Sequence, residues 1–164
     1  LRVLRAHGSK PKYYHAEVGG NFRLDEIQAA VLNVKLDFLD GWTQGRNTNA
    51  AMYDRLFGQM RLQDKVRTPL HLDGFRHVYN QYVIRVKDRD ALRRHLSARD
   101  VGTEIYYPVP LHAQKCFAEL GYAGSDFPVS MAAAADSLAL PIYPELSARQ
   151  LEHVAQSIAE FYRG

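Results

Sequence analysis

The residue types best suited to chemistry lie near the start of the chain, in a basic and glycine-rich segment over residues 7–23. Residues 1–23 hold five Lys or Arg and one acid, a net charge of +4, whereas the rest of the chain carries −1. Glycines let backbone N–H groups approach a ligand, and the segment leads into an expected helix N-terminus, which carries partial positive charge. Such a segment suits a phosphate or diphosphate. A solvated basic loop without a ligand has the same composition and stays open as an alternative.

A second candidate segment is Tyr106–His112, which holds two tyrosines, two prolines and a histidine. The prolines keep it extended, and its polar rings offer hydrogen bonds to a polar ligand. The pattern alone favours the alternative, a rigid connector with buried tyrosines. His71 and His77 lack the neighbouring ligands of a metal site, so no metal is expected. Cys116 is expected to pack rather than to act as a nucleophile.

The composition is that of a globular protein, with 46% hydrophobic and 24% charged residues among 164. No apolar run approaches the roughly 20 residues of a membrane span, and no basic helix or aromatic signature indicates nucleic-acid binding. The single cysteine allows no intrachain disulfide. A reducing compartment is therefore favoured, and we expect a cytoplasmic protein. The chain begins without Met and in mid-pattern, which predicts a piece of a longer protein.

The elements around the basic segment must position it. Residues 1–6 have the pattern of a helix end that stops at Gly8, followed by a loop over 8–22. A long helix is expected from Asp25 to Gly58, with a bend at Gly41. Its apolar residues recur at steps of three and four, which indicates one buried face. In this chain alone that face is expected to be exposed and to promote self-association; it comprises Leu24, Ile27, Val31 and Val34.

The remaining chain predicts a small α+β domain, with a sheet of about three strands covered by helices. Residues 59–76 are expected to form a loop. Ser147 and Gln150 have capping-box spacing at the start of the last helix. The expected strands are residues 78–86, 103–107 and 139–142, and the expected earlier helices are residues 88–99, 114–120 and 129–138.

Four stretches together resemble the signature of the DegT/DnrJ/StrS sugar aminotransferases. Each stretch is a weak signal alone, but they occur in the family's order over essentially the whole chain. The stretches are His7-Gly8 with Lys12-Tyr13-Tyr14-His15 and the run Gly20–Ala30, then His77–Tyr82, Tyr106–His112 and Leu138–Leu146.

The resemblance implies the fold type I architecture of aspartate aminotransferase and a pyridoxal 5′-phosphate (PLP) cofactor. Family enzymes move an amino group from glutamate to a nucleotide-linked keto-sugar. Their large N-terminal domain holds most of the cofactor pocket and the Schiff-base lysine, upstream of the point where this sequence begins. The chain then corresponds to the C-terminal portion: an active-site loop over 1–23, a connecting helix over 24–58 and a small α/β domain over 59–164.

The resemblance also assigns residues. It implies a homodimer with shared active sites, in which Asn21 binds the PLP phosphate and Arg23 contacts an anion. Lys12 and Tyr13 are expected at the substrate diphosphate, with no catalytic residue and no metal ligand in this chain. The remaining expected substrate contacts are Tyr14, His15, Tyr107 and His112.

Two alternatives to this aminotransferase stay open. A few relatives are sugar dehydratases that use pyridoxamine phosphate and have histidine in place of the Schiff-base lysine, a position outside this sequence. The other alternative is a non-catalytic binding domain or a remnant. Because a PLP enzyme needs the lysine to hold the cofactor and to move protons, we expect the 164-residue chain alone to be inactive.

Overall fold

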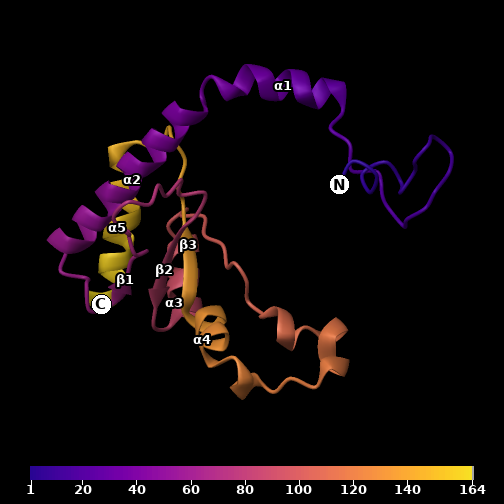
Figure 1. The fold of residues 1–164 in the computed structure, drawn as a ribbon. Helices are drawn as coiled ribbons and strands as arrows, with labels where there is room; N and C mark the ends of the chain where they lie inside the picture. The colour runs from indigo at the N-terminus through magenta and orange to yellow at the C-terminus, as the bar shows by residue number, and fades with distance from the viewer. Residues whose placement is uncertain (164) are drawn as a thin grey trace. The chain divides into compact units, whose positions relative to one another are not determined.

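The computed structural model describes residues 1–163. The described residues divide into two compact units, one over 1–40 and one that begins at Gly41. Figure 1 gives the order and labels of the elements. The two units are described separately below. The expected α+β class with a three-stranded sheet is confirmed, and the sheet lies entirely in the second unit. Within residues 1–163, no helix combines the length and the hydropathy that a membrane span requires.

The first unit begins with a folded-back loop rather than the expected helix end over residues 1–6. The backbone forms turns that do not continue into a helix, and Gly8 N–H donates to Val3 O at 2.9 Å. His7 and Gly8 both have positive φ, 59° and 70°, which reverses the chain direction. The left-handed conformation at these two residues ends any helical repeat before it forms.

Two helices replace the single long helix expected over 24–58. Helix α1 spans Glu26–Leu36 and helix α2 spans Leu39–Gln59. The interruption lies at residues 37–38, where Phe38 N–H donates to Lys35 O at 3.1 Å, and not at Gly41, which lies inside α2. Asp25 is the N-cap of α1 as expected, but its side chain makes no capping hydrogen bond.

The sheet of the second unit is antiparallel in the order β1-β2-β3, with β1 Val66–Arg67, β2 Tyr82–Val86 and β3 Ser137–Leu140. Two of the expected strands are present with altered bounds. The expected strand over 103–107 reduces to one bridge, Glu104 with Ala139, closed by two backbone hydrogen bonds of 2.8 and 3.2 Å. Strand β1 falls within the expected loop over 59–76, because a two-residue strand leaves no alternating pattern in the sequence.

Helices account for most of the rest of this unit. They are α3 Arg89–Ser97, α4 Pro128–Asp136 and α5 Ala148–Arg163, with short 3₁₀ turns at Leu111–Ala113, Lys115–Leu120 and Gly124–Asp126. The capping box at α5 is confirmed. Ser147 N–H donates to Gln150 Oε1 at 2.9 Å, and Gln150 N–H donates to Ser147 Oγ at 3.4 Å.

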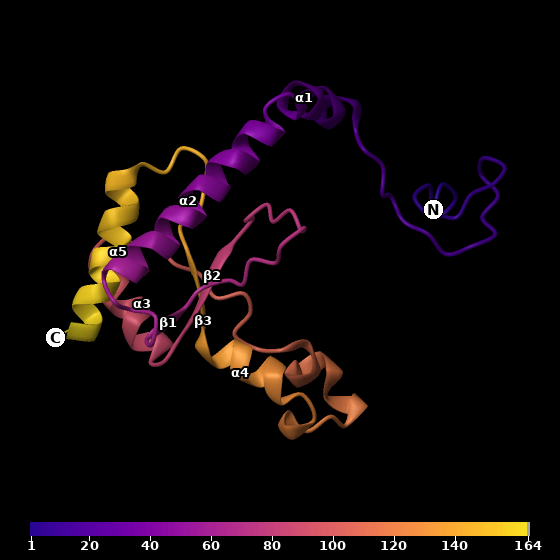
Figure 2. The ribbon, with the colours of Figure 1, turned by 60° about the vertical axis from the view of Figure 1, so that its left-hand side comes forward.

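The core of the second unit lies between the sheet and the helices α2, α3 and α5. Alternate residues of β2, beginning with Tyr82, are buried there. Tyr53 of α2 packs against Tyr82 with ring centroids 5.0 Å apart, and α2 and α5 lie side by side next to the sheet (Figures 1 and 2). Each such fully buried aromatic ring stabilises the fold by about 1.5–3 kcal/mol.

Both core tyrosines keep their hydroxyls hydrogen-bonded. Tyr82 Oη donates to Asp54 Oδ1 at 2.5 Å, and Tyr53 Oη donates to Pro141 O at 3.0 Å. Burial, and then the bond to Asp54, raises the pKa of Tyr82. Burial is also the main cause that raises the pKa of Tyr53. Both hydroxyls therefore stay protonated in the folded state at pH values where an unfolded tyrosine ionises.

Alkaline pH should unfold the second unit through these two tyrosines. Above the unfolded pKa of about 10, the unfolded state loses protons that the folded state keeps, so stability falls by about 1.4 kcal/mol per pH unit for each tyrosine. Tyr82→Phe should lower the slope by one tyrosine's share, about 1.4 kcal/mol per pH unit, between roughly pH 10.5 and 11.5. Urea unfolding at several pH values measures it. Tyr14→Phe, at a position 71% exposed, is the control and should leave the slope unchanged; an undiminished slope in Tyr82→Phe contradicts the assignment.

Helix α1 buries none of its side chains, which confirms that its apolar face is exposed in this chain. Ile27 and Val34 are 82% and 68% exposed. Exposed apolar surface of this extent promotes association. The apolar face is continued by Leu24 and Val31, which are 59% and 53% exposed.

We expect the chain to self-associate through this face. The double substitution Ile27→Glu with Val34→Glu should shift the mass measured by light scattering toward the monomer, because burying a carboxylate without a partner is costly. Asn33→Glu adds a charge on the opposite side of the same helix and should leave association unchanged. A wild-type chain that stays monomeric at high concentration would contradict this expectation.

Candidate functional site

The basic segment expected at a phosphate is a backbone-bonded loop that folds back on residues 3–8. Gly20 N–H donates to Leu4 O at 2.9 Å, and His7 N–H donates to Gly20 O at 3.1 Å. Ala16 N–H donates to Gly8 O at 3.0 Å, which closes the loop further out. These bonds hold the loop in one conformation, although every side chain that the resemblance assigns to it is exposed.

Gly8 is the position in this loop that tolerates no other residue. It is the only buried residue among residues 1–40, and a Cβ at this position would lie 1.7 Å from Glu17 O. Its φ of 70° is also unfavourable for any other residue. Gly19 faces the same crowding, because its Cβ would lie 2.4 Å from Leu4 O. The glycines therefore serve close packing of backbone on backbone.

Asn21 and Arg23 lie together where the loop leads toward α1. Arg23 Nε donates to Asn21 Oδ1 at 2.8 Å. This bond uses the only acceptor atom of the pair, so the Asn21 amide N–H₂ and the outer guanidinium N–H groups remain as donors. A group of donors with one positive charge suits a phosphate oxygen.

The residues expected at the diphosphate form the tip of the loop. Tyr14 N–H donates to Pro11 O at 3.0 Å, and Lys10 N–H donates to Tyr14 O at 2.8 Å. The Lys12 ammonium lies 4.9 Å from the centre of the Tyr13 ring, within cation–π range. His15 Nδ1 is 2.8 Å from His7 O, so one ring nitrogen is used inside the loop.

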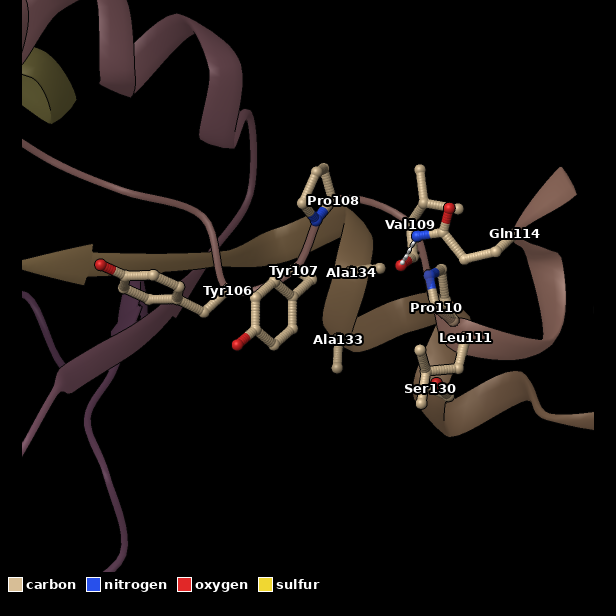
Figure 3. A pocket seen from close by; sticks show the side chains of 10 residues that line it. All are labelled: Tyr106, Tyr107, Pro108, Val109, Pro110, Leu111, Gln114, Ser130, Ala133 and Ala134. Carbon is tan, nitrogen blue, oxygen red and sulfur yellow. Dashed lines mark hydrogen bonds between the residues drawn. The ribbon is translucent and has the colours of Figure 1, made fainter. Parts of the chain in front are cut away.

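Tyr107 lines a cavity of about 450 Å³ in the second unit. Figure 3 shows its ring beside Ala133 of α4, with Tyr106 turned away toward the sheet. The two rings meet edge to face, with centroids 5.8 Å apart. Gln114 Nε2 donates to Val109 O at 3.2 Å across the segment. The lining is mostly apolar, with a few polar groups, as in small-molecule pockets.

His112 does not line this cavity. Its ring packs on Phe127 with centroids 4.6 Å apart, and Phe127 in turn packs on Tyr122 at 5.2 Å. His112 Nε2 is buried and has no hydrogen-bond partner among residues 1–163. The cavity instead includes residues of α4 that the sequence did not single out, namely Ser130, Ala133 and Ala134. The alanine run of α4 was their only signal.

The sequence-predicted residues thus fall into two groups. Lys12, Tyr13, Tyr14, His15, Asn21 and Arg23 belong to the loop of the first unit, and Tyr107 and His112 belong to the second unit. No group of three or more His, Cys, Asp or Glu side chains is placed to hold a metal ion within residues 1–163.

Comparison with known proteins decides the family. The profile of the DegT/DnrJ/EryC1/StrS aminotransferase family matches residues 1–159. The chain belongs to the DegT/DnrJ/EryC1/StrS aminotransferase family. The solved structure of S. venezuelae DesV, in complex with a ketimine intermediate, is similar to this chain at a TM-score of 0.90 and 34% identity, over 99% of this chain and 43% of that one.

Two curated relatives illustrate how the family match extends over the sequence. The chain is 49% identical over 162 residues to a protein of Geobacillus stearothermophilus named pleiotropic regulatory protein. It is 36% identical over 166 residues to the dTDP-3-amino-3,6-dideoxy-alpha-D-galactopyranose transaminase of Aneurinibacillus thermoaerophilus. These matches cover 99% and 98% of this chain but 43% of each relative. The chain therefore spans less than half the length of these relatives, in agreement with the C-terminal portion expected from sequence.

The loop should lose its conformation when Gly8 is replaced by alanine. The Cβ clash with Glu17 O and the positive φ both oppose the native backbone, and the φ alone costs roughly 1–2 kcal/mol. We expect hydrogen exchange at the Ala16 and Gly20 amides to speed up at least tenfold, with the amides of the second unit unchanged. Gly121→Ala is the matched control, because Gly121 has the same φ of 70° but open space around it. Unchanged exchange at Ala16 in Gly8→Ala would refute the role assigned to Gly8.

Proposed function

We propose that this chain is the C-terminal portion of a PLP-dependent aminotransferase that moves an amino group from glutamate to a nucleotide-linked keto-sugar. In this proposal, the chain binds the phosphate groups of the cofactor and the substrate and contacts part of the sugar. The observation that carries the proposal is the loop of residues 1–23, which has a net charge of +4 and an Asn21–Arg23 pair with free donors. Both PLP and the substrate bring phosphate groups, which such a loop attracts.

Asn21 and Arg23 fit the cofactor phosphate. Because Arg23 Nε occupies Asn21 Oδ1, the amide of Asn21 presents its N–H₂ group outward. When bound, PLP supplies the electron-withdrawing ring that makes transfer of the amino group possible. The donors of Asn21 and Arg23 would hold its phosphate and so fix the position of that ring.

The tip of the loop fits a diphosphate. The Lys12 ammonium is exposed above the Tyr13 ring, so it keeps its charge available to an anion. Tyr13 and Tyr14 are 77% and 71% exposed, which leaves both hydroxyls free to donate to phosphate or sugar oxygens. His15 contributes through the nitrogen that His7 O does not occupy.

Tyr107 would contact the sugar from the rim of its cavity, where it is 72% exposed. His112 lies outside this cavity, packed on Phe127, and its proposed contact with the substrate rests on Nε2, the buried ring nitrogen that lacks a hydrogen-bond partner within residues 1–163. A homodimer with shared sites is part of the proposal, because exposed side chains in a loop enclose a ligand only when another surface covers them.

In this proposal, the Schiff-base lysine that holds the cofactor lies outside this chain. None of its lysines stands in the sequence context that the family resemblance gives for the Schiff-base position; they are Lys10, Lys12, Lys35, Lys65, Lys87 and Lys115. The chain by itself is then unable to move the proton between substrate and cofactor carbons.

A non-catalytic binding protein of the same fold is the second candidate. One observation favours it: the relative that is 49% identical is named a regulatory protein rather than an enzyme. The dehydratase alternative also belongs to this fold, and the same experiment separates all three.

Transfer of ¹⁵N from labelled glutamate to a dTDP-linked keto-sugar, read by mass spectrometry, tests the proposal. The 164-residue chain with PLP should give no labelled sugar. The chain joined to a large PLP domain of the family should give it, and Asn21→Ala in that protein should raise the PLP dissociation constant about tenfold, a loss of roughly 1.4 kcal/mol.

A matched control is Asn33→Ala, on the exposed surface of α1, which should leave cofactor affinity unchanged. Turnover by the 164-residue chain alone would overturn the proposal that the Schiff-base lysine lies outside this chain. Bound PLP with loss of a sugar hydroxyl and no label would point to the dehydratase. Nucleotide-sugar binding without either reaction would favour the binding protein.

A further inference from the structure

Another cavity of the second unit lies at the N-terminal end of α5. None of the site residues that the family resemblance assigns lines it, although Pro141, Tyr143 and Leu146 belong to the last signature stretch. The cavity volume is about 570 Å³, within the range of small-molecule pockets. Figure 2 shows the connection from β3 to α5, which forms one wall, passing beside α2. Asn49 Nδ2 donates to Tyr143 O at 2.7 Å, which fixes that connection to α2.

The floor of this cavity is apolar and firmly packed. Val101, Leu146 and Val154 line it, and they are 5%, 6% and 4% exposed. All three belong to the hydrophobic core, so the floor is already formed without a ligand. A preformed apolar floor suits a hydrocarbon ring or chain.

The rim carries an available positive charge. Arg149 lines the cavity from the first turn of α5, and its guanidinium has no hydrogen bond or ion pair within residues 1–163. That turn holds no acidic residue, although an acid there would stabilise the helix. His153 also lines the rim, and its Nε2 lies 3.0 Å from Arg99 O.

One negative charge shares the rim. Asp100 lines the same cavity, and no ion pair joins it to Arg149. A guanidinium and a carboxylate in one cavity together tolerate a single negative charge but disfavour a second one. From the apolar floor and this charge pattern, we infer that the cavity binds a small apolar monocarboxylate, whose carboxylate pairs with Arg149.

Three probes with the same naphthyl body and different charge test this site: 1-naphthaleneacetate, its uncharged amide and 1-naphthyl phosphate. Each is titrated into the ¹⁵N-labelled chain, and amide chemical shifts are followed by NMR. The acetate should shift amides of residues 100–102 and 146–154 and should bind at least fivefold more tightly than the other two.

Variants locate the charge. Arg149→Gln should weaken the acetate at least fivefold and leave the affinity of the amide unchanged, because only the guanidinium pairing is lost. Asp100→Asn should tighten the phosphate. Arg163→Gln, at the other end of the same helix, removes an exposed charge outside the cavity and should change none of the affinities.

Three results would overturn the inference: shifts confined to other residues, equal affinity for acetate and amide, or an Arg149→Gln chain that binds the acetate as the wild type does. The readout depends on binding alone, so it does not depend on the proposed aminotransferase activity. Arg149 is exposed, and the spectrum of its variant reports directly whether the fold is kept.

Discussion

The second unit depends on one buried contact, the packing of Tyr53 of α2 against Tyr82 of β2. Their rings bring a helix and the central strand together, while their hydroxyls are satisfied by Pro141 O and Asp54. A buried hydroxyl without a partner costs roughly 1–3 kcal/mol, so both bonds are needed for the rings to be stably buried. One contact thus sets the distance between α2 and the sheet and also ties down the chain after β3.

That tie has consequences for the two cavities of the second unit described above. The connection from β3 to α5 is held by Tyr53 at Pro141 and by Asn49 at Tyr143, so one wall of the cavity beside α5 is fixed from α2. The bridge from Glu104 to Ala139 then attaches the chain leading to Tyr107 to the same strand, β3. The position of Tyr107 is therefore set by backbone hydrogen bonds several residues away.

The sequence predicted well what periodicity and capping encode. Residue spacing predicted the last helix with its Ser147–Gln150 capping box, the buried strand at Tyr82 and the apolar face of α1. The pairing of strands distant in sequence could not be predicted, because β1 is two residues long and residues 103–107 pair at a single bridge. The break at residues 37–38 also escaped prediction, since a helix interruption without Gly or Pro carries no local marker.

The site residues divide along the same line. The family motifs identified the loop residues in the sequence. Only the structure shows that Arg23 donates to Asn21 Oδ1 and that His112 packs on Phe127 rather than lining the cavity. The contrast between the two units explains the difference in what they can do. The second unit has a core that holds preformed cavities, whereas residues 1–40 bury only Gly8 and rely on backbone hydrogen bonds. A loop so built has a defined conformation but no enclosed space of its own. In the proposed phosphate site, the loop's exposed donors would reach useful affinity only where a second surface excludes water, and this argues for the proposed shared site over one built from the loop alone.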